Sequence, residues 1–324
     1  MSQNEDTVVF ALPKHIDVPF VLLYQKNFDE IYKDCAHTTD DIRVIAFEGT
    51  KKIGSLGLKR HNYEIQTVIM GRHSQCPLRL LCPSISLRHI ILILYPKSAD
   101  FQYQLIDLNS TTGFSIDEEE TSFSMWANGA VFIRIRQYSF FILAPQQIDW
   151  NESEPKIWLQ LSNRNYEWSN RQRLSNSSFN ISMPIEQDEY QQDMSNIEDK
   201  SNSISIQHPP IWLNESNILN PYARLDILFK HGTKRILLSE EMLERGILIG
   251  RYERCGISLD GSTEFNPISR VHCLFITILG TNYVIDTAST NGTVLFHERI
   301  TQKKLIAKAP IILAETLIMS WEQL

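Results

Sequence analysis

Short apolar runs, rather than long amphipathic ones, dominate two regions of the chain. Between residues 41 and 146 they include "DIRVIAFEG", "EIQTVIMG", "HIILILY" and "AVFIRIRQYSFFIL", and beyond residue 222 they include "ARLDILF", "GILIGR" and "HCLFITIL". These runs are rich in β-branched and aromatic residues, and Gly, Asn, Ser and Pro separate them. The pattern predicts an all-β protein with two β-sandwiches, at residues 41–146 and 222–324.

The other segments lack this alternation. In residues 1–40, which we leave unassigned, "TVVFAL" and "PFVLLY" resemble short strands and "NFDEIYKDC" resembles helical turns. Residues 147–221 are rich in Asn, Ser, Gln and acidic residues, which bury too little apolar surface to offset the entropy of ordering. We expect an acidic, flexible linker there, with "KIWLQL" and "PPIWLN" packing on the flanking domains. The charged stretch "SEEMLERG" at 239–246 is interpreted as a solvated loop, with a helical turn as the alternative.

The two strand-rich regions repeat one set of motifs. Each copy has Gly-Arg ("MGRH", "IGRY"), then Ser-x-x-His ("SLRH", "SRVH"), then Asp-x-x-Ser-Thr-x-Gly ("DLNSTTG", "DTASTNG"). Gly71 and Gly113 lie 42 positions apart, and so do Gly250 and Gly292. The same landmarks in the same order over the same span indicate two copies of one domain.

Both copies resemble forkhead-associated (FHA) domains, whose pattern is Gly-Arg, Ser-Arg-x-His and Ser-x-Asn-Gly on successive loops of a β-sandwich. The resemblance covers residues 41–146 and 222–324, and it implies recognition of phosphothreonine in a partner protein without catalysis. By this resemblance, the phosphopeptide site of the second domain consists of Arg251, Ser269, Arg270, Thr290 and Asn291. The residues that support its motif are Gly250, His272 and Gly292.

These residue types suit a phosphate group. A phosphothreonine carries a charge of about −1.5 to −2 and three acceptor oxygens. Arg251 offers several donors in a rigid fork, and Ser269 adds a short hydroxyl. Asn291 donates and accepts at once, which suits clamping the main chain of an extended peptide. We expect His272 to join two loops rather than to contact the ligand.

The first copy departs from the pattern at two positions. Leu87 stands where the family has Arg, and Arg88 is one place further on, where a strand-like backbone directs its side chain to the opposite face. Thr112 replaces the Asn before Gly113. The residues that remain for a candidate second site are Arg72, Ser86 and Thr111. Two interpretations stay open for this domain: phosphopeptide binding, or a structural or protein-binding surface.

Charge and composition narrow the class of protein. The net charge of −7 argues against broad nucleic-acid binding, which needs an excess of Lys and Arg. Five scattered cysteines indicate reduced thiols rather than a disulfide scaffold or a zinc site. The chain shows no signal peptide and no apolar run of the roughly 20 residues that cross a bilayer. We therefore expect a cytoplasmic or nuclear protein without membrane insertion.

Enzyme signatures are missing from the sequence. We find no Walker A loop, HExxH, GxSxG, dinucleotide fingerprint or kinase motif. We therefore expect no enzyme, no cofactor and no metal. The predicted function is an adaptor that binds phosphothreonine-containing proteins in kinase-dependent signalling, mainly through the second domain. The alternative is a structural scaffold or oligomerisation protein with vestigial phosphate pockets.

Self-association is a further hypothesis. Residues 151–215 contain no threonine, so this segment is a poor internal ligand for a phosphothreonine-binding site. The stretch "HTTDDI" is a better candidate, because Thr38 and Thr39 are followed three residues later by Asp41 and Ile42, and the family often reads that position. A phosphorylated Thr38 or Thr39 is then predicted to dock on a second copy of the protein.

Overall fold

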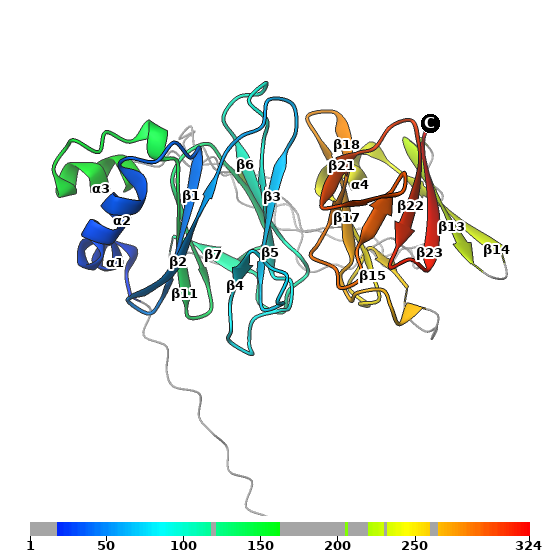
Figure 1. Ribbon diagram of the computed structural model, residues 1–324, viewed down its shortest axis with the longest axis horizontal. Helices are drawn as coiled ribbons and strands as arrows, with labels where there is room; N and C mark the ends of the chain where they lie inside the picture. Colours follow the sequence, from blue (N-terminus) through cyan, green and yellow to red (C-terminus); the bar gives the residue numbers. More distant parts are fainter. Residues whose placement is uncertain (1–17, 118–120, 163–204, 207–219, 230–231, 260–264) are drawn as a thin grey trace, which may run out of the picture.

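A computed structural model describes residues 18–117, 121–162, 205–206, 220–229, 232–259 and 265–324. Strands dominate these ranges, and they form four sheets in two sandwiches, as the sequence predicts (Figure 1). Most of residues 147–221, and the stretches "TVVFAL" and "PPIWLN", lie outside the described residues.

The first sandwich consists of two six-stranded sheets. One sheet contains, in spatial order, β2 (Lys51–Leu58), β1 (Ile42–Glu48), β11 (Tyr138–Leu143), β10 (Val131–Ile135), β7 (Phe114–Ile116) and β8 (Thr121–Ser122). The other contains β12 (Ser205–Ile206), β9 (Ser124–Ala127), β6 (Tyr103–Asp107), β5 (Ile90–Leu94), β3 (Gln66–Gly71) and β4 (Leu78–Arg79).

The second sandwich repeats this plan. Its six-stranded sheet contains, in spatial order, β14 (Gly232–Leu238), β13 (Ala223–Phe229), β23 (Leu317–Gln323), β22 (Lys308–Leu313), β19 (Thr293–Leu295) and β20 (Glu298–Ile300). Its five-stranded sheet contains β16 (Ile257–Ser258), β15 (Ile247–Gly250), β17 (Cys273–Ile278), β18 (Thr281–Asp286) and β21 (Gln302–Lys304). In each sandwich the strand that ends in the Gly-Arg motif has a short parallel neighbour, β4 or β16.

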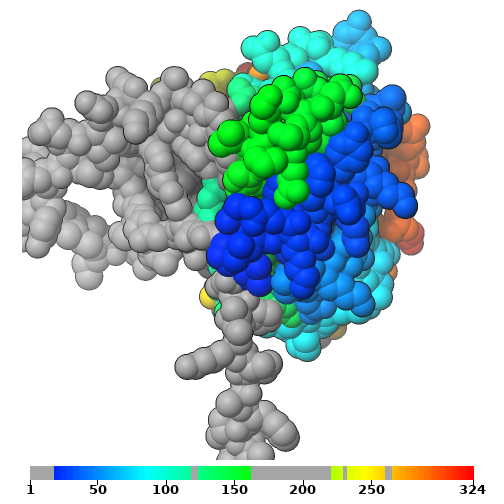
Figure 2. All heavy atoms as spheres, turned by 90° about the vertical axis from the view of Figure 1, so that its left-hand side faces the viewer, coloured from blue at the N-terminus to red at the C-terminus, as the bar shows by residue number. Residues whose placement is uncertain are grey.

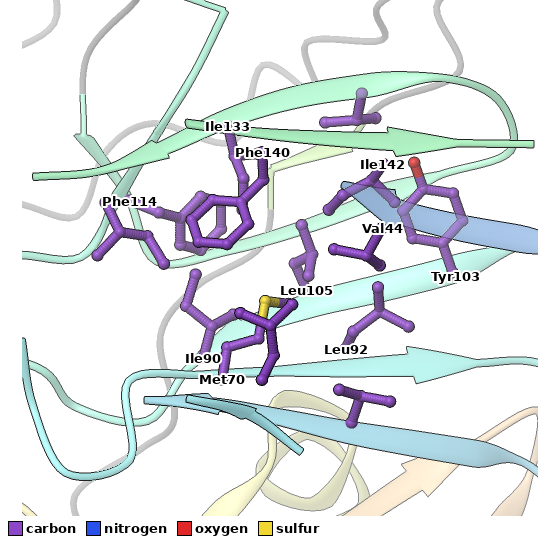
Figure 3. Packing of buried hydrophobic residues seen from close by; sticks show 14 of the residues in the cluster. Val44, Met70, Ile90, Leu92, Tyr103, Leu105, Phe114, Ile133, Phe140 and Ile142 are labelled. Atoms are coloured by element: carbon purple, nitrogen blue, oxygen red, sulfur yellow. The ribbon is translucent and has the colours of Figure 1, made fainter. Parts of the chain in front are cut away.

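Alternation along each strand builds the cores. Leu92 on β5 and Leu105 on β6 face Val44 and Ile142 of the opposite sheet, and all four are fully buried (Figure 3). Because successive side chains of a strand point to opposite faces, this core takes every second residue and leaves the others for the outer face of the sheet.

Helices cover the outer face of the first sheet. The sequence predicted helical turns for "NFDEIYKDC", which is one of them, but not the other two helices or the face that all three cover. They are α1 (Phe20–Lys26), α2 (Phe28–Cys35) and α3 (Glu154–Ser162), and they lie side by side at one end of the molecule (Figure 2). The stretch "PFVLLY" is therefore a helix and not a strand, because Phe20, Leu23 and Tyr24 recur at helical spacing and are all buried. "KIWLQL" does pack on a flanking domain, as part of α3.

Two short helical elements complete the fold. A 3-10 helix (Pro145–Gln147) follows the last strand of the first sandwich. The stretch "SEEMLERG" forms α4 (Glu240–Arg245) rather than a loop, because Ser239 caps it and Leu243 is buried in the second core. Across the described ranges, no helix is long and apolar enough to span a bilayer.

The two sandwiches contact each other directly through a third apolar cluster. On β5, Ile91 and Ile93 point away from their own core and into this cluster, and Leu274 and Ile276 on β17 do the same. We call this cluster the interdomain face; its buried members are Ile65, Ile69, Cys76, Ile91, Ile93, Tyr95, Ile106, Leu108, Leu248, Cys255, Val271, Leu274, Ile276, Ile278, Tyr283 and Ile285. Both faces of β5 and β17 are therefore buried, which explains why "HIILIL" and "HCLFITIL" are continuously apolar.

Candidate functional site

The five motif residues of the second domain meet in one pocket. Arg251 follows β15, Ser269 and Arg270 precede β17, and Thr290 and Asn291 lie between β18 and β19. All five line a cavity of about 190 Å³. No Asp or Glu is among the described residues that line it. Among the described residues, the site therefore combines positive charge with neutral donors and contains no competing carboxylate.

Gly250 allows two of these loops to touch. A Cβ atom at this position would lie 2.2 Å from the carbonyl oxygen of Arg270 and 2.9 Å from that of Ser269. The approach brings the Arg251 N–H to the Ser269 carbonyl at 3.1 Å. The first domain repeats this contact, since a Cβ on Gly71 would lie 2.4 Å from the Leu87 carbonyl oxygen. The close packing of the two loops therefore requires a residue without a side chain at Gly71 and at Gly250.

Arg251 is held in place by one hydrogen bond. Its Nε donates to the carbonyl of Ile268 at 2.6 Å, which fixes the plane of the guanidinium. Its two terminal nitrogens have no partner among the described residues. A planar fork with two free donor groups is the geometry that binds phosphate oxygens in pairs.

Ser269 and Thr290 form the hydroxyl part of the site. Ser269 Oγ accepts the Thr290 N–H at 3.0 Å and lies 3.5 Å from Thr290 Oγ1. Asn291 is exposed, and its Nδ2 donates to the Pro267 carbonyl at 2.7 Å. Its side chain thus joins two loops, while Oδ1 has no partner in the described part of the chain and is available as an acceptor.

His272 lies beneath the pocket and does not line it. Its Nδ1 accepts the Ser269 N–H at 3.1 Å, so Nε2 carries the proton and donates to the Gly292 carbonyl at 3.0 Å. Burial lowers the pKa of His272, which keeps the ring neutral. His89 makes the same two contacts, with Ser86 and Gly113, and burial lowers its pKa to about 4. The structure thus places both histidines between loops.

A turn stabilised by the side chains of Asp286 and Ser289 supports the loop between β18 and β19. These two residues were not assigned a role from the sequence. Asp286 accepts hydrogen bonds from the Ser289 N–H at 2.7 Å and the Ser289 hydroxyl at 2.6 Å, and Ser289 Oγ accepts the Gly292 N–H at 2.9 Å. Asp107 and Ser110 repeat this turn in the first domain. The signal was present as the repeated Asp-x-x-Ser, which is a short-range side-chain-to-backbone turn.

The cysteines serve packing rather than cross-linking. All five are free thiols. Cys76 and Cys255 occupy equivalent positions, and their Sγ atoms contact the carbonyls of Leu87 and Arg270. The described residues contain no cluster of His, Cys, Asp and Glu that could hold a metal ion.

The candidate residues of the first domain also line one cavity. Arg72, Ser86 and Thr111 border a space of about 230 Å³, and Arg72 Nε donates to the Ile85 carbonyl at 3.1 Å, as Arg251 does to Ile268. Arg270 of the second domain lines this cavity as well. The cavity is therefore closed by both domains, which the sequence did not predict.

Comparisons with known proteins agree with the repeat. The FHA domain model matches residues 68–124 and 247–313. No curated protein sequence matches the chain. The solved structure of Rv1747 FHA-1 from Mycobacterium tuberculosis is 18% identical, with 32% of this chain and 98% of that chain covered and a TM-score of 0.25. The FHA domain of CT664 from Chlamydia trachomatis is 20% identical, with 32% and 97% covered and a TM-score of 0.28.

The two matched regions contain the repeated Ser-x-x-His and Asp-x-x-Ser motifs and the pocket residues described above. FHA domains are generally non-catalytic interaction modules. This chain carries two FHA domains in tandem.

Proposed function

We propose that the protein is a non-enzymatic adaptor that binds phosphothreonine peptides, mainly through its second FHA domain, in kinase-dependent signalling in the cytoplasm. One observation carries the proposal: Arg251, Ser269, Arg270, Thr290 and Asn291 line a single pocket that no described carboxylate enters. A doubly negative phosphate would meet two arginines there, without competition from any described carboxylate of the lining.

In this proposal each group of the pocket has a role. The free terminal nitrogens of Arg251 bind phosphate oxygens, and the Ser269 hydroxyl donates to another. Asn291 Oδ1 accepts an N–H from the main chain of the bound peptide. Arg270 is exposed at the rim, where it adds attraction without a fixed contact.

Fluorescence anisotropy with the full chain tests this function. The probes are oriented peptide libraries that carry phosphothreonine, phosphoserine or unmodified threonine. We expect binding to phosphothreonine alone, and Arg251→Ala should weaken it by about 2–5 kcal/mol, the cost of removing one partner of a desolvated charge pair. Arg235→Ala is the matched control, because Arg235 is an exposed arginine on β14, the edge strand of the six-stranded sheet.

Equal binding of all three libraries, or binding of none, would contradict the proposal. It would favour the scaffold or oligomerisation alternative, which sedimentation of the full chain then tests.

A peptide of residues 33–45 phosphorylated at Thr38 or Thr39 is included as the candidate for self-association. Thr39 is exposed, so a kinase could reach it in the folded protein.

A further inference from the structure

Arg88 belongs to the first domain, but its side chain ends in the second. The residue is 5% exposed. Its Nε donates to the carbonyls of Thr287 at 2.7 Å and Ala288 at 3.0 Å, and its Nη2 reaches Ser269 Oγ at 3.3 Å. Arg88 thus contacts a residue of the candidate phosphopeptide site from across the domain boundary.

This buried cation has no ion-pair partner within the described part of the chain. Among the described residues, no carboxylate lies within 4 Å of its guanidinium, and all of its hydrogen bonds go to neutral oxygens. Burial lowers the pKa of Arg88; Cys76 and Asp286 oppose this shift, and Arg270 adds to it. A buried charge is costly unless an opposite charge compensates it. An anion in the neighbouring pocket would supply that charge.

The pocket itself is built by both domains. His73, Leu87 and Arg88 form the first-domain wall of the cavity that holds Arg251 and Ser269. Arg88 Nη1 has no hydrogen-bond partner in the described ranges. Ser269 Oγ accepts N–H groups from Thr290 and Arg88, so only its own proton can be donated. That proton makes a long contact of 3.5 Å with Thr290 Oγ1, which a closer phosphate oxygen would replace. Arg88 therefore orients the Ser269 hydroxyl as well as adding charge.

We propose that the phosphopeptide site is composite, and that Arg88 of the first FHA domain supplies a cation to the phosphate held by Arg251 and Ser269 of the second. This inference rests on the proposed function. It also accounts for the departure of the first domain from the family pattern. Leu87 takes the place of the family arginine, and the arginine one residue later serves the site of the neighbouring domain.

The test compares Arg88→Gln with the wild-type full chain, using the phosphothreonine peptide selected from the library. Glutamine keeps a hydrogen-bond donor but removes the charge. We expect the dissociation constant to rise about tenfold, close to the lower limit of the coupling measured for close charge pairs at interfaces. The gain in wild-type affinity between pH 5 and pH 7, as the phosphate loses its second proton near pH 6, should be smaller in the variant.

Gln302→Ala is the matched control for loosening of the domain contact. Gln302 Nε2 donates to the Ile65 carbonyl at 2.7 Å, and Gln302 Oε1 accepts the hydroxyl of Thr67. Ile65 and Thr67 lie at the start of β3, whereas Gly71, beside the site, lies at its end. This variant should bind the peptide as the wild type does. An equal loss in Gln302→Ala would overturn the inference, because Arg88 would then act only by holding the domains together.

Two other results would also overturn it. Unchanged affinity in Arg88→Gln would show that the cation does not act on the phosphate, and tighter binding would show that Arg88 blocks the pocket. Either result leaves the proposed function intact if Arg251→Ala still abolishes binding. If neither the wild type nor Arg88→Gln binds any phosphopeptide, the proposed function and the composite site fail together.

Discussion

At the scale of single residues, the repeated motifs mark the positions where two loops are in close contact. Each Gly-Arg glycine lies where two loop backbones touch, and each motif histidine joins the same pair of loops from below. The sequence predicted a bridging role for His272, and the geometry of Ser269 and Gly292 around it fits that role. The sequence could not predict the contacts of Arg88, because its partner Thr287 lies 199 residues away in another domain.

Gly250→Ala tests the close approach. The added Cβ would lie 2.2 Å from a backbone oxygen, so the loops that carry Ser269 and Arg270 must move apart. We expect the free energy of unfolding to fall by about 1–3 kcal/mol, as for other overpacked sites. Urea denaturation of the full chain measures this.

Gly54→Ala is the control for that experiment. Gly54 lies on the exposed strand β2, with no atom within 4 Å of the position of an added Cβ. Its effect should stay within about 0.5 kcal/mol. Equal midpoints for Gly250→Ala and the wild type would mean that the loops adjust freely, contrary to the packing described here.

At the scale of elements, strands were more predictable than short helices, for which the sequence favoured helical turns only at α2. Periodicity identifies a strand of five or six residues in the sandwiches, because alternate residues enter the core. For "PFVLLY" and "SEEMLERG" the runs are too short to separate helix from strand or loop, and tertiary contacts decide. Phe20 lies against Phe132 and Phe141 of the first sandwich, with ring centroids 5.3 and 5.6 Å apart.

The cap of α4 is testable on its own. Ser239 Oγ accepts the Met242 N–H at 3.2 Å, which satisfies one free donor of the first turn. Ser239→Ala should lower the free energy of unfolding by about 1 kcal/mol, and Ser239→Asp should restore it, because aspartate caps equally well. If the aspartate variant is as unstable as the alanine variant when both are unfolded in urea, the cap is not the source of the stability.

At the scale of the whole molecule, the interdomain face makes the two domains one unit. Ile91 lies between Ile69 and Ile106 on neighbouring strands, and all three belong to this face rather than to the core of the first sandwich. The composite site depends on this docking, since Arg88 reaches Ser269 only when the faces meet.

Ile91→Lys should separate the domains without unfolding them. A lysine there would be buried without a partner while the domains are docked, but solvated once they part. We expect a larger radius of gyration by small-angle X-ray scattering, with an unchanged far-ultraviolet circular dichroism spectrum. Ile53→Lys is the control, because Ile53 is 42% exposed. An unchanged radius in Ile91→Lys would contradict the docking described here.

The sequence by itself determined the two sandwiches and the five second-domain residues that come to line one pocket, because strand alternation and turn motifs are local patterns that repeat at a fixed spacing. Only the tertiary structure decided what covers the outer faces of the sheets. The continuous apolar runs of β5 and β17 signalled a second buried face, but not whether a helix, a linker or the other domain would cover it. Because the outer faces of β5 and β17 are buried against each other, Arg88 and Arg270 come to lie at pockets of both domains, which no local pattern encodes.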